Sequence, residues 1–154
     1  MKRPTLIDDF EIDRAYESPP HVVTKEDSVE FARRYDPQPF HLDEVVAQAS
    51  TFGGLVCGGF QTAALAWALA LKSRMFDDCS LAGIGIESLG WHLPVKPGDI
   101  VRCRFALVSW RPSQSRPGTA VARIRYELIN DGDQAVLTML MLQLVRCRVP
   151  PPSA

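Results

Sequence analysis

The stretch GGFQTAALAWALALKSR, residues 58–74, decides the fold of this chain. Between Phe60 and Leu71 only Gln61 and Thr62 are polar, and alanine and leucine fill most of the other positions. A helix that is apolar on all sides has to be buried. At 1.5 Å per residue, these 17 residues would form a helix about 25 Å long. The sequence therefore predicts one long helix in the interior of the protein.

The chain after residue 78 has the pattern of β-strands. Candidate strands cover residues 81–95, 100–110, 119–129 and 134–147, with turns at 96–99 and 130–133 and a loop at 111–118. In the third strand, apolar residues at every second position alternate with Arg123, Arg125 and Glu127. The fourth strand is apolar on both faces over residues 137–142, so we expect both faces to be covered.

The elements before the long helix are shorter. Residues 10–16 form a candidate first strand, and Thr24 is the expected N-cap of a helix that ends at Asp36, because Pro37 prevents its continuation. A second short helical stretch is expected over residues 42–50. Together these elements predict a single α+β domain with its core at about residues 10–148, in which an antiparallel sheet curls around the buried helix. A second copy of the chain is the simplest cover for the last strand.

Composition excludes several classes of protein. Lys and Arg number 17 and Asp and Glu 18, giving a net charge of −1, so neither nucleic acid nor an anionic membrane is an expected partner. The longest wholly apolar run, residues 63–71, is shorter than a membrane span, and the first residues lack the apolar core of a signal peptide. Four cysteines lie far apart, which favours reduced core thiols in a cytoplasmic protein and argues against a metal site.

The segment Asp36-Pro37-Gln38-Pro39-Phe40-His41 carries the chemical signal. Both Asp36 and Gln38 precede a proline, and a residue in that position is driven away from helical geometry. We therefore expect a rigid extended bend that holds a carboxylate and an imidazole in fixed relation. These two groups are sufficient for general acid–base catalysis near neutral pH.

This segment, continued to Leu42 and Asp43, resembles the hydratase motif of the MaoC-like dehydratases, the (R)-specific enoyl-CoA hydratase family: Asp, any residue, Asn or Gln, Pro, any residue, His. The resemblance continues through residues 52–56 and Gly59 into the apolar helix, and to the Lys-Pro-Gly-Asp turn at 96–99. It implies a hotdog fold, in which a curved antiparallel sheet wraps a long helix, and edge-to-edge assembly into a homodimer or a higher oligomer.

The resemblance also implies an activity, namely addition of water to, or its removal from, the C2–C3 bond of an acyl-coenzyme A thioester. Asp36 and His41 fall on the catalytic pair of the family, and Gly59 on the glycine whose backbone N–H holds the thioester oxygen. Coenzyme A enters only as part of the substrate, and no cofactor is implied.

Other positions are candidates for binding the substrate. Gly58 stands where family members often have a histidine, and Trp67 where they have a serine, so Trp67 is expected either to narrow the acyl tunnel or to belong to the core. Arg111, Ser113 and Arg116 suit the phosphates of coenzyme A, since arginine pairs with phosphate in bidentate fashion. An ordinary solvated loop is an equal alternative for this segment.

Two other functions fit the same residues. One is a hotdog thioesterase, which attacks the carbonyl group of the same substrates. The other is a non-catalytic acyl-CoA-binding or partner subunit.

Overall fold

The computed structural model describes residues 4–148. In chain order its elements are η1 (Ile7–Asp9), β1 (Tyr16–Glu17), β2 (His21–Val22), α1 (Lys25–Tyr35), α2 (Pro39–Leu42), α3 (Glu44–Ala49), α4 (Gly59–Lys72), β3 (Ser80–Trp91), β4 (Ile100–Pro112), β5 (Thr119–Asn130) and β6 (Ala135–Arg146). The four long strands and the long helix lie where the sequence predicts them.

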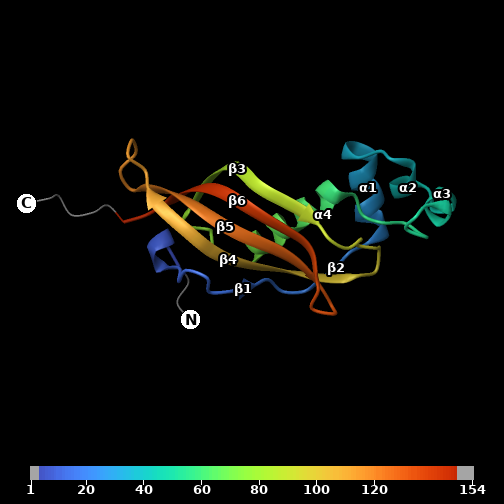
Figure 1. The fold of residues 1–154 in the computed structure, drawn as a ribbon, viewed down its shortest axis with the longest axis horizontal. Helices are drawn as coiled ribbons and strands as arrows, with labels where there is room; N and C mark the ends of the chain where they lie inside the picture. Colours follow the sequence, from blue (N-terminus) through green and yellow to red (C-terminus); the bar gives the residue numbers. More distant parts are fainter. Residues whose placement is uncertain (1–3, 149–154) are drawn as a thin grey trace, which may run out of the picture.

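The strands form one antiparallel sheet in the order β1-β4-β5-β6-β3, and the short strand β2 also pairs with β4. Figure 1 shows the long strands running side by side, with α4 along one face of the sheet. Helices α1, α2 and α3 gather at one end of the sheet, and the loop between β4 and β5 lies at the opposite end (Figure 1). The sheet therefore separates two ends of the molecule, and only one of them carries the helices.

The core lies between α4 and the sheet. Ala66, Leu69 and Ala70 of the helix are at most 2% exposed. Opposite them the alternation in β5 buries Ile124 and Tyr126 while its arginines lie on the other face, as the sequence predicts. Small alanine side chains bring the helix backbone close to the sheet, which lets the aromatic rings of the strands fill the remaining space.

Two predictions about the N-terminal half are wrong. Residues 10–16 do not form a strand: Phe10 packs in the core against Tyr16 and Phe76, and only Tyr16–Glu17 pairs with β4. Residues 36–41 are not extended throughout, because Pro39 starts the one-turn helix α2 with Gln38 as its N-cap. Proline suits the first position of a helix, where its missing N–H would have no intrahelical partner. The two residues before the prolines, Asp36 and Gln38, are non-helical as expected.

Several elements of the molecule expose apolar side chains. Strand β3 lies at the sheet edge, and its Leu81, Ile84 and Ile86 are 41–52% exposed. The helix α4 is not buried on all sides of a single chain, since Phe60 and Leu71 are exposed. The outward face of β6 is only partly buried. These surfaces agree with the expectation that the fold needs a further cover.

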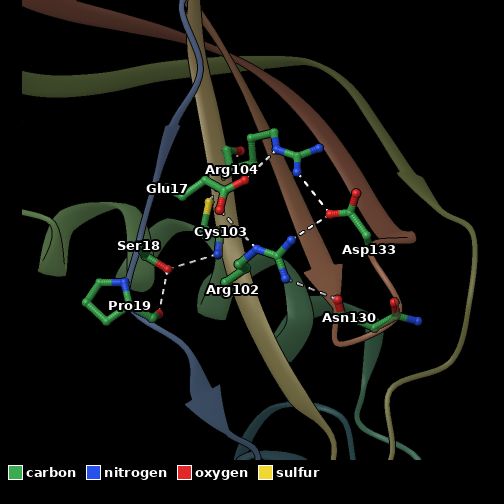
Figure 2. Close-up of polar contacts among 8 residues, drawn as sticks. All are labelled: Glu17, Ser18, Pro19, Arg102, Cys103, Arg104, Asn130 and Asp133. Atoms are coloured by element: carbon green, nitrogen blue, oxygen red, sulfur yellow. Dashed lines mark hydrogen bonds and ion pairs between the residues drawn. The ribbon is translucent and has the colours of Figure 1, made fainter.

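An ion-pair network ties the other edge of the sheet together. Glu17 of β1 accepts hydrogen bonds from Arg102 and Arg104 of β4, at 3.1 and 2.8 Å. Both guanidinium groups also donate to Asp133 in the β5–β6 turn, at 2.6 and 3.0 Å (Figure 2). Next to it, Ser18 Oγ accepts from the backbone N–H of Cys103 (Figure 2). The network holds the two-residue strand β1, which is too short to be stable on its strand pairing alone.

All four cysteines are buried free thiols, as predicted. Burial raises the pKa of Cys79 to about 11 and that of Cys103 to about 12, so these thiols remain protonated at neutral pH. Within residues 4–148, no helix has both the length and the apolar character that a membrane span requires.

Candidate active site

The backbone between α1 and α3 is fixed by successive caps. Asp36 is the C-cap of α1, and its N–H donates to the carbonyl of Ala32. One turn later, the carboxylate of Asp43 accepts from the N–H groups of Val45 and Val46 at 2.8 and 2.9 Å. Asp43 therefore caps α3. Between these caps the chain has little freedom, and Asp36 and His41 are presented from a rigid turn.

The ring of His41 is oriented by the segment that precedes α4. Its Nδ1 lies 2.7 Å from the carbonyl oxygen of Val56, which only accepts, so Nδ1 carries a proton. The neutral ring then has its lone pair on Nε2. This nitrogen lies 3.4 Å from Oδ2 of Asp36. The side chain of His41 is only 6% exposed, and it lines the cavity described below.

The carboxylate of Asp36 is held at both of its oxygens. Oδ1 accepts a 2.7 Å hydrogen bond from Nε2 of Gln38, and Oδ2 faces His41. Gly58 packs directly against the same carboxylate, since a Cβ added to Gly58 would lie 2.8 Å from Oδ2. No ordinary side-chain contact is that short. The absence of a side chain at position 58 therefore allows Asp36 to occupy its place beside His41.

The N-terminus of α4 lies beside this pair. Gly58 is the N-cap and offers no side chain to the first turn, unlike Thr24 and Asp43, which cap α1 and α3. Gly59 is the first helical residue, and N–H groups at this position have no intrahelical acceptor. They also lie at the positive end of the helix dipole. The start of α4 can therefore donate hydrogen bonds to a developing negative charge.

These groups line one cavity of about 450 Å³. Most of its wall is apolar or aromatic, and its ionisable or amide side chains are Asp36, Gln38, His41, Cys57 and His92. The lining residues are Asp36, Gln38, Phe40, His41, Phe52, Val56, Cys57, Gly59, Phe60, Thr62, Trp91, His92, Leu93, Pro94 and Val95. An apolar cavity with a few convergent polar groups is the usual form of a small-molecule site.

Comparison with known proteins identifies the family. Residues 9–129 match the MaoC like domain, which is well over half of the chain. The chain belongs to the MaoC-like dehydratase family. The MaoC-like dehydratase from Rhodospirillum rubrum is 30% identical, with a TM-score of 0.82, over 93% of this chain and 97% of that one. The uncharacterized protein YdeM from Bacillus subtilis is 28% identical over 112 residues, which are 73% of this chain and 79% of that protein.

More distant structures share the fold. The R-hydratase PhaJ1 from Pseudomonas aeruginosa superimposes with a TM-score of 0.74 over 97% of this chain and 96% of its own, at 19% identity. The curved sheet around α4 is thus the hotdog fold that the sequence motif implied.

The structure brings together the three residues predicted to be catalytic. Asp36, His41 and Gly59 all line the cavity of this MaoC-like domain. Gly58 does not line it but contacts Asp36 from behind. Their catalytic roles stay predictions, but their placement at one cavity is what those roles require.

The other predicted binding residues lie elsewhere in the chain. Trp67 packs edge to face against Tyr126 in the core, with ring centroids 5.6 Å apart, and does not line the cavity. Arg111, Ser113 and Arg116 lie at the β4–β5 end of the sheet, opposite the helices that form the cavity (Figure 1). Within one chain this loop does not reach the cavity, so its role in binding coenzyme A stays a prediction.

Several cavity residues were not singled out from the sequence. Gln38 is part of the motif, and its position two residues from Asp36 was the available signal. Phe60 and Trp91 give no such signal, because an aromatic residue at a helix start or a strand end is usually a packing residue. Their rings meet edge to face at a centroid distance of 5.8 Å.

Proposed function

We propose that this protein is a hydratase/dehydratase that adds water to, or removes it from, the C2–C3 bond of an acyl-CoA thioester of the (R)-3-hydroxyacyl type. The observation that carries the proposal is the pair formed by Asp36 Oδ2 and His41 Nε2, 3.4 Å apart at the wall of the cavity. Neither group is paired with a lysine or arginine there. Both can therefore bind and exchange a proton with a water molecule placed between them.

The proposed hydration begins with that water molecule. Its oxygen attacks C3 of the enoyl group while one of its protons passes to the Asp36–His41 pair. The carbonyl oxygen of the thioester becomes an enolate oxygen and accepts a hydrogen bond from the backbone N–H of Gly59. The pair then returns a proton to C2, so that one hydroxyl and one hydrogen are added overall. Dehydration follows the same steps in reverse.

Each part of this mechanism has an expected magnitude. A positioned acid–base group contributes about 10²–10⁴-fold to a rate. A backbone donor to an oxyanion contributes about 10²–10³-fold. The tautomer fixed by Val56 places the accepting lone pair on the nitrogen that faces Asp36.

The proposed assembly is a homodimer. The edge strand β3 and α4 both expose apolar residues that a second copy would cover. An exposed sheet edge of this length offers unpaired backbone groups to another strand. Sedimentation equilibrium tests this proposal, and a monomer at micromolar concentration would contradict it.

A panel of enoyl-CoA thioesters of increasing chain length tests the activity, with loss of the absorbance of the conjugated double bond as the readout. Hydration supports the proposal. Release of free coenzyme A thiol without hydration would indicate a thioesterase instead. Tight binding of the esters without either reaction would indicate a non-catalytic acyl-CoA-binding subunit.

The same panel examines Trp67. Because Trp67 packs in the core and not at the cavity, Trp67→Phe should leave the chain-length profile unchanged. A profile extended to longer chains would show that Trp67 limits the acyl site.

A further inference from the structure

We infer that Trp91 is a positioning residue that holds the oxyanion-binding turn of α4 in place. This inference rests on the proposed function, because it assigns to Trp91 the orientation of the N–H that binds the thioester oxygen. Trp91 is the last residue of β3, so it belongs to an element 32 residues away from Gly59 in the chain. The sheet thereby reaches the start of the helix.

A hydrogen bond makes this connection. Nε1 of Trp91 donates to the carbonyl oxygen of Gly59 at 2.8 Å. The same carbonyl accepts from Oγ1 of Thr62 at 2.7 Å. The indole thus fixes the peptide that follows Gly59, and Thr62 fixes it from within the helix. With this carbonyl held from two directions, the first turn has little freedom to rotate the adjacent N–H groups.

Close packing makes the arrangement specific to glycine at position 59. A Cβ on Gly59 would lie 2.8 Å from Cε2 and 2.9 Å from Nε1 of Trp91. The indole therefore lies close to the Cα of Gly59, in space that the Cβ of any other residue would occupy. The φ angle of Gly59 is not in the left-handed region, so the backbone conformation does not require glycine. Contact with Trp91 is the reason for glycine that the structure shows.

Trp91 is exposed although its side chain is fixed by a hydrogen bond and by packing. It is 48% exposed and lines the cavity, with Phe60 packed against its ring. A tryptophan that only filled the core would be buried. Its position between the cavity and the first turn of α4 is instead suited to orienting a catalytic group, since a small misplacement of such a group can lower a rate by up to about 10²-fold.

The first experiment removes the indole N–H. Trp91→Phe keeps an aromatic wall but loses the donor, and we expect kcat for enoyl-CoA hydration to fall roughly tenfold with little change in KM. A residue that only lined the cavity would raise KM and leave kcat unchanged. Trp110→Phe is the matched control, because Trp110 lies on β4 outside the cavity, and it should keep the wild-type kcat.

The second experiment is a double-mutant cycle. Gly59→Ala keeps the backbone N–H but displaces the indole, so its effect should be nearly the same as that of Trp91→Ala. The double variant should lose no more kcat than either single variant, because both substitutions break the same contact. Gly58→Ala is the control, since its Cβ would meet Asp36 and not Trp91. The loss of kcat in Gly58→Ala and that in Trp91→Ala should multiply in the double variant. Multiplicative effects of Gly59→Ala and Trp91→Ala would overturn the inference.

A measurement without substrate separates the two proposals. In wild-type protein the indole N–H of Trp91, assigned by its loss in Trp91→Phe, should exchange slowly with solvent, and Gly59→Ala should abolish this protection. Fast exchange in the wild type would overturn the contact. An active enzyme with unchanged kcat in Trp91→Phe overturns the role of Trp91 alone. A wild-type protein inactive on every enoyl-CoA overturns the proposed function, and with it the catalytic role of Trp91.

Discussion

Two clusters of charged groups in this molecule hold their carboxylates in opposite ways. Glu17 and Asp133 are each bound by two guanidinium groups at an exposed sheet edge, where every strong donor already has an acceptor. Asp36 accepts a hydrogen bond from one amide and faces an imidazole at a cavity. In the first arrangement the hydrogen bond from Arg104 lowers the pKa of Glu17, and the cluster serves the fold. In the second, the carboxylate faces a cavity with no lysine or arginine paired to it among residues 4–148, and this distinguishes the candidate catalytic acid.

The largest effect is expected when the Asp36–His41 pair at the cavity is broken. Asp36→Asn preserves shape but removes the charge, and His41→Gln keeps a donor for Val56 but removes the imidazole. Each should lower kcat for hydration by about 10²–10⁴-fold, because each removes half of the proton-transferring pair.

Glu17→Gln is the matched control in the other cluster and should keep the wild-type kcat. Steady-state kinetics decide the comparison, with thermal unfolding to verify that every variant is folded. Near-normal rates in Asp36→Asn or His41→Gln would contradict the proposed mechanism.

A smaller effect is expected when the space around Asp36 is reduced. Gly58→Ala places a methyl group where Oδ2 of Asp36 now lies, so the carboxylate has to move away from His41. We expect kcat to fall roughly 10- to 100-fold, as for other small misplacements of catalytic groups. Gly132→Ala, in the β5–β6 turn beside the ion-pair network, should leave kcat unchanged, since its nearest neighbour would be 3.4 Å away. Equal rates for the two variants would show that Asp36 adapts freely.

The hydrogen bond from Gln38 should matter less again. Gln38→Met retains the shape of the side chain and removes the 2.7 Å hydrogen bond to Oδ1 of Asp36. We expect a loss of roughly 5- to 10-fold in kcat with KM unchanged, the size of one hydrogen bond. Gln38→Asn keeps an amide donor and should recover most of the rate. Full activity in Gln38→Met would show that the hydrogen bond from Gln38 does not orient Asp36 for catalysis.

Most of the fold follows from local patterns in the sequence. The alternation in β5 and the apolar run of α4 are consequences of which faces are buried, and each is complete within one segment. The two errors have different causes. Residues 10–16 have apolar positions that suit a strand, but Phe10 and Tyr16 are used to cover the core beside Phe76. The one-turn helix α2 depends on Pro39, which forbids a helix before it and favours one after it.

The site was predictable to the extent that it is one motif. The motif identified Asp36 and His41 as a pair, but their close approach depends on the one-turn helix α2, which the sequence did not predict. The contribution of Trp91 could not be predicted, because it depends on the length of β3 and on how the sheet end meets α4. The loop with Arg111 and Arg116 carries suitable chemistry, yet the sheet places it at the end opposite the cavity.

The smallest expected effect concerns stability and the exposed cluster. The hydrogen bond from Arg104 lowers the pKa of Glu17 below its usual value of 4.5. A depressed pKa stabilises the fold at every pH above 4.5, and this contribution is lost as the pH falls from 4.5 through the folded-state pKa. Because the Glu17 side chain is 40% exposed and screened by solvent, Glu17→Gln should cost under about 1 kcal/mol in the free energy of unfolding at pH 7.

Urea denaturation of wild type and Glu17→Gln at pH 7 and at pH 3 measures this contribution. The difference between the two proteins should shrink at pH 3, where Glu17 of the wild type becomes protonated as it unfolds. It should also shrink in 1 M salt at pH 7, because exposed charges are screened at about 3 Å under these conditions. A difference in the free energy of unfolding that persists in both conditions would mean that Glu17 stabilises β1 by packing. The guanidinium groups would then not be what distinguishes this cluster from the Asp36–His41 pair.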